Sequence, residues 1–156
     1  MERREFVAGI AATAVGLVAS SAARADAPGH AGHKMAPPSP PISKELRAII
    51  DATSSCEKTG QVCLAHCTEL LATGDTTMAD CQRGVMNMLA VCDATFKAAS
   101  YHSADPKNLK ALARVCAEFC RTCAKACEPH AGHHEECKAC MESCNACAKA
   151  CDAYAA

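Results

Sequence analysis

The spacing of the cysteines constrains the fold of this chain more than any other feature of its sequence. Two series near the C-terminus step alternately by three and four residues. One series is Cys116, Cys120, Cys123 and Cys127, and the other is Cys137, Cys140, Cys144, Cys147 and Cys151. Residues three and four apart lie on one face of an α-helix. The spacing therefore predicts two helices that carry rows of thiols where a helical bundle normally carries leucine.

Four helical segments are expected after a proline-rich stretch. They cover roughly residues 43–73, 76–100, 105–128 and 132–154. Ser43 is a suitable N-cap for the first segment, Gly74 ends it, and Asp105-Pro106 is typical of a helix start. Because the connections are short, neighbouring helices should run antiparallel. We expect an all-α fold, an antiparallel up-down-up-down four-helix bundle with a cysteine-lined core.

The remaining cysteines fall on the predicted inward faces of the first two helices. They are Cys56, Cys63, Cys67, Cys81 and Cys92. The inward faces also carry larger side chains, namely Leu46, Ile49, Leu70, Val85, Met88 or Leu89, Phe96, Leu109 and Leu112. In an antiparallel bundle, Leu46, Ile49, Phe96, Leu109 and Leu112 collect at one end as an apolar plug. Most thiols stack above this plug, and we name the stack of fourteen cysteine sulfurs the sulfur column.

The N-terminus is typical of an exported protein. Arg3-Arg4 precedes an apolar run from Val7 to Ala19, and Ala23-Arg24-Ala25 offers a cleavage site. This pattern predicts a twin-arginine export signal that is removed in the mature protein, with a Sec signal or a membrane anchor as the alternatives. We expect a periplasmic protein without membrane attachment after cleavage. The expected parts are the signal at residues 1–25, a flexible His- and Pro-rich linker at 26–42, and the helical domain at 43–156.

Rows of buried thiols indicate a soft metal ion. Cu(I) is content with two or three soft ligands, which adjacent thiols in a bundle provide. Structural zinc needs four ligands converging at one point, and iron–sulfur clusters use another cysteine pattern. If each Cu⁺ matches one thiolate, the loaded core is formally neutral, which avoids the cost of burying charge. The sequence thus predicts multiple Cu(I) ions, on the order of one per cysteine.

A disulfide scaffold is the main alternative use of these cysteines. Their number is even, and an exported protein meets an oxidising compartment. Neighbours on one helix face, however, are poorly oriented for a disulfide, and such a bridge closes only a small loop. Bridges between helices stay open as an alternative for a few pairs.

The combined pattern resembles the exported bacterial copper storage proteins, which are cysteine-lined four-helix bundles that hold many Cu(I) ions. The resemblance rests on the twin-arginine leader, the tail His30-Ala31-Gly32-His33-Lys34-Met35, the segment Cys63-Leu64-Ala65-His66-Cys67 and both cysteine series. It implies storage of Cu(I) for a copper-dependent enzyme. It also implies a homotetramer.

Imidazole and thioether side chains are expected at the open end of the column, where the loops after the first and third helices meet. They are His66, Met78, His130, His133 and His134. These groups bind Cu(I) less tightly than thiolates, so they suit a site where copper is taken up and released. The resemblance supports His66 and Met78 as ligands there. For the three loop histidines, and for His30, His33 and Met35 in the linker, metal binding and a solvated surface role both stay open.

Other classes of function are less well supported. A formal net charge of −1 leaves no basic face, so nucleic acid is not an expected partner. The sequence has no Ser-His-Asp constellation or nucleotide-binding loop, so we do not expect an enzyme. A copper chaperone or detoxification protein is the alternative to storage, although a chaperone needs only one or two exposed thiols. A disulfide-stabilised helical module is the other alternative.

Overall fold

The structure is a computed structural model that describes residues 41–101 and 105–156. The predicted export signal and most of the predicted linker, with His30, His33 and Met35, lie outside the described residues. All fourteen cysteines lie within them. The helices described below belong to one compact unit.

Four α-helices make up this unit. They are α1 (Lys44–Ala72), α2 (Ala79–Ser100), α3 (Pro106–Cys127) and α4 (Glu135–Ala155). Two short 3₁₀ turns accompany them, Thr76–Met78 before α2 and Glu128–His130 after α3. The predicted number and order of helices are therefore confirmed.

The predicted capping residues explain where two helices begin and where one ends. Ser43 Oγ accepts a hydrogen bond from the Leu46 amide at 3.1 Å, at the start of α1. Asp105 Oδ1 accepts one from the Lys107 amide at 2.8 Å, at the start of α3. Such bonds satisfy amides that have no partner within the helix. Gly74, with a φ of 94°, follows α1 in a left-handed conformation that favours glycine.

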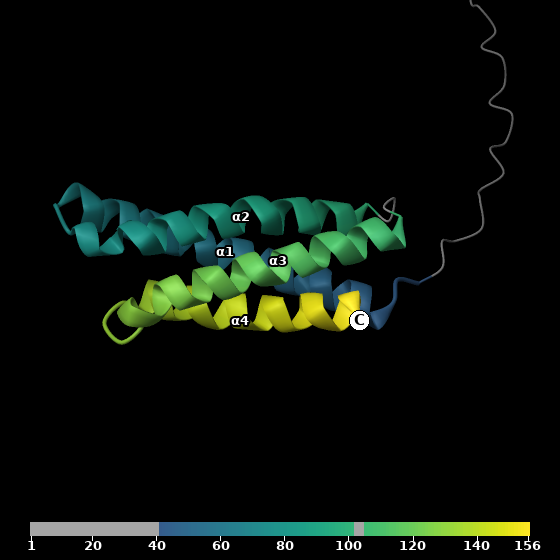
Figure 1. Ribbon diagram of the computed structural model, residues 1–156. Helices are drawn as coiled ribbons and strands as arrows, with labels where there is room; N and C mark the ends of the chain where they lie inside the picture. The colour runs from purple at the N-terminus through teal and green to yellow at the C-terminus, as the bar shows by residue number, and fades with distance from the viewer. Residues whose placement is uncertain (1–40, 102–104) are drawn as a thin grey trace, which may run out of the picture. The chain divides into compact units, whose positions relative to one another are not determined.

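Each helix packs against the next one along the chain, and α1 packs against α4 to close the ring. The helices run alternately up and down (Figure 1), which confirms the antiparallel four-helix bundle. The α1–α2 and α3–α4 connections lie together at one end, which we call the mouth end. The start of α1 and the end of α4 lie at the opposite, far end. None of the described helices is long and apolar enough to cross a membrane.

The inward positions follow a regular alternation of four- and three-residue steps. On α2 the buried residues are Cys81, Val85, Met88, Leu89, Cys92, Thr95 and Ala99. On α1 they are Ile49, Thr53, Cys56, Gly60, Cys63 and Cys67. An average step of 3.5 residues is the heptad pattern of helices that pack closely with a small angle between their axes.

Two of the predicted inward residues are wrong. Phe96 and Leu112 are only half-buried, and the neighbouring Thr95 and Ala113 are fully buried instead. Thr95 and Ala113 continue the regular steps, which Phe96 and Leu112 do not. The large side chains misled the prediction, because small residues fit where two helices approach closely. The buried Thr95 hydroxyl donates to the Val91 carbonyl at 2.7 Å, so it leaves no unsatisfied polar group.

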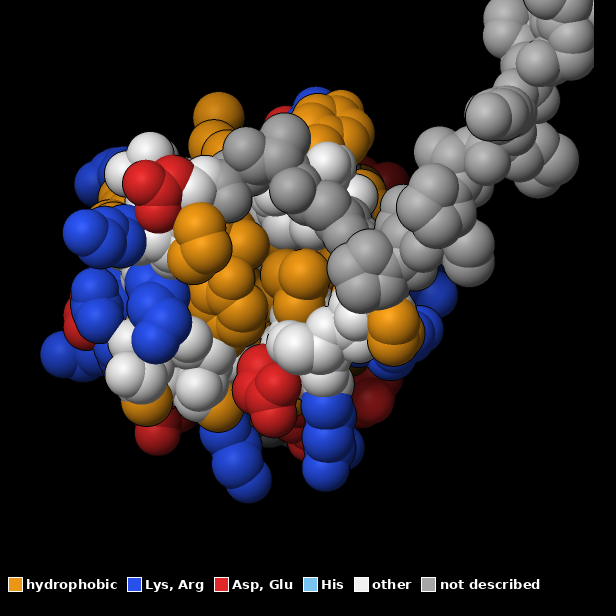
Figure 2. Space-filling view, turned by 90° about the vertical axis from the view of Figure 1, so that its right-hand side faces the viewer, with side chains coloured by type: hydrophobic (Ala, Val, Ile, Leu, Met, Phe, Trp, Pro, Cys, Tyr) orange, Lys and Arg blue, Asp and Glu red, His pale blue; other side chains and the backbone are white. Residues whose placement is uncertain are grey.

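Hydrocarbon side chains close the far end of the bundle. Ile49 and Leu109 are buried, and Leu46 is half-buried against the core. Figure 2 looks onto this end and shows hydrophobic side chains gathered at its centre, inside a rim of Lys, Arg, Asp and Glu. The expected plug is therefore present, although its predicted members Phe96 and Leu112 are only half-buried. Hydrocarbon at this end opposes the passage of an ion.

Candidate metal centre

The sulfur column is present between the four helices. All fourteen cysteines are fully buried, with no exposed surface. All fourteen are free thiols, so none of the disulfides considered in the alternative is formed in this structure. Every one of the four helices contributes to the column.

Sulfur atoms from different helices lie close together along the column. The shortest separation, 3.4 Å, joins Cys81 Sγ to Cys127 Sγ, and other pairs are 3.6 to 4.0 Å apart. A metal–sulfur bond of about 2.3 Å, as in zinc thiolates, places the sulfurs of a trigonal site roughly 4.0 Å apart. The thiols therefore already have nearly the spacing that a shared ion requires.

Every cysteine belongs to at least one group of three or four sulfurs that lie within 4.8 Å of one another. The groups are Cys63, Cys67, Cys81 and Cys137; Cys63, Cys127 and Cys140; Cys123, Cys140 and Cys144; Cys56, Cys92, Cys120 and Cys147; and Cys116, Cys147 and Cys151. Three cysteines, Cys63, Cys140 and Cys147, belong to two groups each. Shared sulfurs can bridge neighbouring ions, and every group has a sulfur in common with at least one other group.

The groups form two halves along the bundle axis. The first three, joined through Cys63 and Cys140, make up the mouth half, and the last two, joined through Cys147, make up the far half. The halves meet where Cys56 Sγ lies 3.6 Å from Cys144 Sγ. Ions at this junction would lie near sulfurs from both halves.

The pKa values of Cys67 and Cys144 are raised, so these two thiols stay protonated in the metal-free protein. Removal from water raises the pKa of the Cys67 thiol to about 12. Contacts with Cys120 and Cys123, together with burial, hold the pKa of Cys144 well above its usual value. A neutral thiol packs like a small apolar group, so the bundle has an apolar interior without metal. Because the thiolate is the ligand, each bound ion must displace protons.

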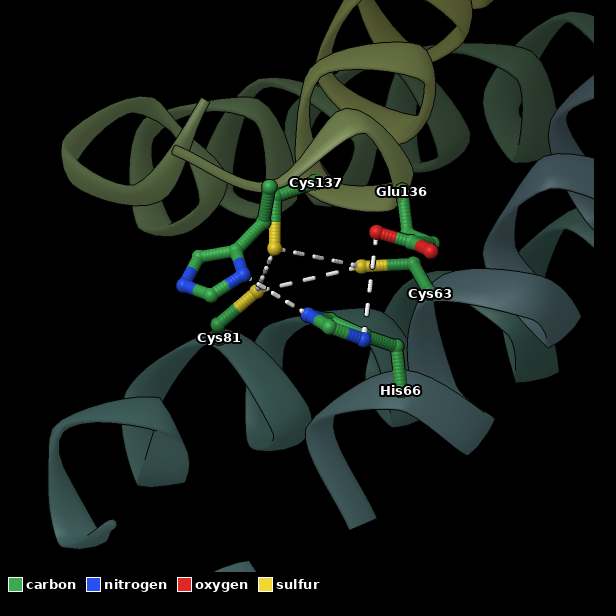
Figure 3. A network of polar contacts seen from close by, with 6 residues as sticks. Cys63, His66, Cys81, Glu136 and Cys137 are labelled. Carbon is green, nitrogen blue, oxygen red and sulfur yellow. Dashed lines mark hydrogen bonds and ion pairs between the residues drawn. The ribbon is translucent and has the colours of Figure 1, made fainter. Parts of the chain in front are cut away.

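Figure 3 shows three sulfurs of the mouth half together with His66 of α1. Cys63, Cys81 and Cys137 come from three different helices and form a triangle with Sγ–Sγ sides of 3.9, 4.0 and 4.0 Å. These sides match the trigonal spacing derived above. The His66 side chain is 19% exposed, and its Nδ1 lies 3.8 Å from Oε2 of Glu136. His66 therefore lies between the sulfur column and solvent.

The loop histidines, whose role the sequence left open, occupy different environments. His134, at the start of α4, has its Nδ1 3.0 Å from Nε2 of His66. The ring of His130 is 6.4 Å from that of His134, and His133 is exposed. The structure therefore places His134 beside His66, the predicted ligand at the mouth, and places His130 near His134.

Of the methionines in the described residues, Met78 and Met88 are fully buried, and they differ in their surroundings. Met78 lies in the 3₁₀ turn at the mouth end, three residues before Cys81, as expected for a mouth residue. Met88, which the sequence predicted as a packing residue, lies beside the column itself. Its Sδ accepts a hydrogen bond from the Cys56 thiol at 3.4 Å. The sequence pattern did not indicate this contact, because an inward methionine more often only fills space.

The fold and this site define the class of protein: a four-helix bundle whose interior is a multinuclear thiol site for soft metal ions. The family model described as copper storage protein matches residues 42–156, which include all four helices. The chain belongs to the copper storage protein family. No curated protein sequence is significantly similar to it.

Solved structures of copper storage proteins share the fold. Ccsp from Streptomyces lividans, loaded with 10 copper equivalents, has a TM-score of 0.66 and 29% identity, covering 72% of this chain and 84% of that chain. The same TM-score and identity hold for the cytosolic copper storage protein from S. lividans with five coppers, covering 72% and 92%. Apo copper storage protein 3 from Bacillus subtilis has a TM-score of 0.60 and 29% identity, covering 70% and 98%.

Proposed function

We propose that this protein stores Cu(I) as many ions bound to the thiolates of the sulfur column. The observation that carries the proposal is the continuity of the column: fourteen free, fully buried thiols in overlapping groups. A site for one ion would need three or four of these sulfurs. Overlapping groups suit a cargo of many ions with shared ligands.

Charge and coordination favour Cu(I) over Cu(II) or zinc. Cu(I) is soft and accepts two or three sulfurs, which the trigonal spacing at the mouth provides. One Cu⁺ per thiolate leaves the buried column neutral, whereas divalent ions with more thiolates leave charge that has no buried partner. The expected capacity is therefore on the order of fourteen ions per chain, one for each cysteine.

Copper is taken up and released at the mouth end in this proposal. The far end is closed by Ile49 and Leu109, whereas His66 and His134 lie at the mouth beside the trigonal thiols. Imidazole is a weaker Cu(I) ligand than thiolate, so an ion bound to it dissociates more readily. His66, His134 and Met78 therefore act as transient ligands, and storage involves no catalytic step.

We further propose that the protein acts outside the cytoplasm. The Arg3-Arg4 leader supports export by the twin-arginine route to the periplasm. The stored copper then supplies a copper-accepting enzyme or chaperone of that compartment, from a protein that forms a homotetramer. Conversion of Arg3 and Arg4 to lysine should retain the protein in the cytoplasm, as cell fractionation would measure; unchanged export contradicts this route.

Anaerobic titration tests the storage function directly. The fully reduced protein is titrated with Cu(I) in the presence of a competing chelator, and free thiols are counted at each step. We expect tight uptake of ten or more ions per chain, roughly one per cysteine, with loss of reactive thiols and constant helical circular dichroism. Tight binding of only one or two ions indicates a chaperone. No tight binding, with few free thiols in the isolated protein, indicates the disulfide-stabilised module.

A further inference from the structure

The cysteine rows are continuous on two helices and interrupted on the other two. On α3 and α4 each step from Cys116 to Cys127 and from Cys137 to Cys151 brings another cysteine. On α1, Gly60 occupies the inward position between Cys56 and Cys63. On α2, the buried Val85, Met88 and Leu89 lie between Cys81 and Cys92. The α1–α2 side of the column therefore has no thiol at its middle level.

Met88 places a different sulfur at the edge of this interruption. Its side chain is fully buried, and its Sδ lies 3.4 Å from Cys56 Sγ. Cys56 is the residue through which the far half meets the mouth half, because its Sγ also lies 3.6 Å from Cys144 Sγ. The Met88 thioether thus lies at the junction of the two halves, in contact with the sulfur that joins them.

Gly60 provides the space that Met88 occupies. A Cβ atom at residue 60 would lie 2.7 Å from Met88 Cε and 2.9 Å from Leu89 Cδ2. Gly60 is itself buried in the middle of a 29-residue helix, where glycine costs about 1 kcal/mol relative to alanine. The absence of a side chain on α1 therefore lets the Met88 side chain reach across to Cys56.

We propose that Met88 is a Cu(I) ligand at the junction, together with the Cys56 thiolate. This proposal rests on the storage function above and adds the sulfur of Met88 to the ligands of the column. A thioether is soft and uncharged, so a Cu⁺ held by the Cys56 thiolate and Met88 is neutral without a second thiolate. Two thiolates on one Cu⁺ would instead leave a net negative charge in a buried place. Met88 thereby raises the number of ligands at the junction without adding charge.

Binding of one Cu⁺ at Cys56 releases one proton, so the charge of the site does not change. Without copper, the Cys56 thiol donates its hydrogen to a lone pair of Met88 Sδ. When Cu⁺ binds, the Cys56 proton leaves to a solvent base, and the same Met88 lone pair coordinates the ion. No electron is transferred. Since a trigonal site separates its sulfurs by roughly 4.0 Å, the flexible Met88 side chain needs only a small movement.

Methionine methyl resonances give a direct test on the full chain. The protein is labelled with [methyl-¹³C]methionine, and Cu(I) is titrated anaerobically while thiols are counted. Coordination changes the electron density at sulfur, so we expect the Met88 methyl resonance to shift during loading. The exposed Met86 serves as the matched control two residues away, and its resonance should stay in place. Met86→Leu and Met88→Leu assign the two signals, and leucine keeps nearly the same volume.

The outcomes separate this inference from the storage function. Uptake of many ions with thiol loss, but with a stationary Met88 resonance, overturns the ligand role and leaves storage intact. Absence of tight uptake overturns both. If Met88→Leu does not fold, Met35→Leu, Met78→Leu, Met86→Leu and Met141→Leu assign four of the six methionine methyl signals. A nuclear Overhauser contact with Gly60 then distinguishes Met88 from Met1 in the wild-type spectrum.

Discussion

His66 Nε2 on α1 and His134 Nδ1 at the start of α4 lie 3.0 Å apart, directly outside the trigonal thiols of the sulfur column. At this distance one ring nitrogen donates a proton and the other accepts it. An ion about 2.0 Å from each nitrogen would need the rings to separate. The two imidazole rings must therefore move apart before both can bind one ion.

Replacing the histidines should alter the rate of copper transfer more than the amount bound. For His66→Ala and His134→Ala we expect capacity within about one ion of the wild type, since the thiols carry the cargo. Transfer to a competing chelator should change by about tenfold, corresponding to about 1.4 kcal/mol in the barrier. Stopped-flow transfer measures the rate. His133→Ala, at an exposed position, is the control. A large fall in capacity would contradict a gating role.

A thiol added at the interruption on α2 should raise the capacity. Val85 is fully buried on the inward face, and Val85→Cys extends the row from Cys81. We expect about one more tightly bound Cu(I) per chain and a stability loss of about 1 kcal/mol from the altered packing. Val62→Cys adds the same thiol at a position that is 55% exposed and serves as the control. Equal capacity of the two variants would show that added thiols in the column do not hold copper.

Copper should protect the thiols against oxidation. The Sγ atoms of Cys81 and Cys127, on α2 and α3, are 3.4 Å apart, so a two-electron thiol oxidant such as glutathione disulfide can join them with small movements. We expect peptide mapping to find the Cys81–Cys127 disulfide in the metal-free protein but not in the loaded one. Cys127→Ala removes this product and is the control. Equal oxidation with and without copper would indicate that these sulfurs are not ligands.

Alkaline pH should destabilise the metal-free protein. The pKa of Cys67 is raised from 9.0 to about 12 in the folded state, mainly by burial. The folded state therefore binds more protons than the unfolded state between these values. The stability that this group contributes is fully present below about pH 9 and is lost as the pH rises towards 12. Anaerobic urea unfolding at pH 8 and at pH 10.5 measures the difference.

The same pKa shift predicts the control for the alkaline unfolding. Cys67→Ala removes the group, so the free energy of unfolding should fall less steeply with pH in this variant than in the wild type. Identical slopes would mean that the Cys67 thiol titrates in the folded protein as it does in the unfolded chain.

The helices and most of the column could be predicted from the sequence because both depend on local spacing. Four-three steps of cysteine place thiols on one helix face whatever the neighbours are, and caps such as Ser43 act within one turn. The prediction that Phe96 and Leu112 face inward was wrong because it followed the size of the side chains and not the four-three spacing of the buried positions. The distance between the helices decides which residues can lie at the interface, and the small Thr95 and Ala113 are the ones that are buried there.

By itself, the sequence determined that four helices form, that short connections make them antiparallel and that their shared face is sulfur. These properties arise within a few residues of chain, through helical periodicity and capping. Only the tertiary structure decided which sulfurs meet across the bundle, that His134 reaches His66, and that Met88 reaches Cys56 over Gly60. Such contacts join residues 17 or more positions apart, and they depend on how closely and in which register the helices pack.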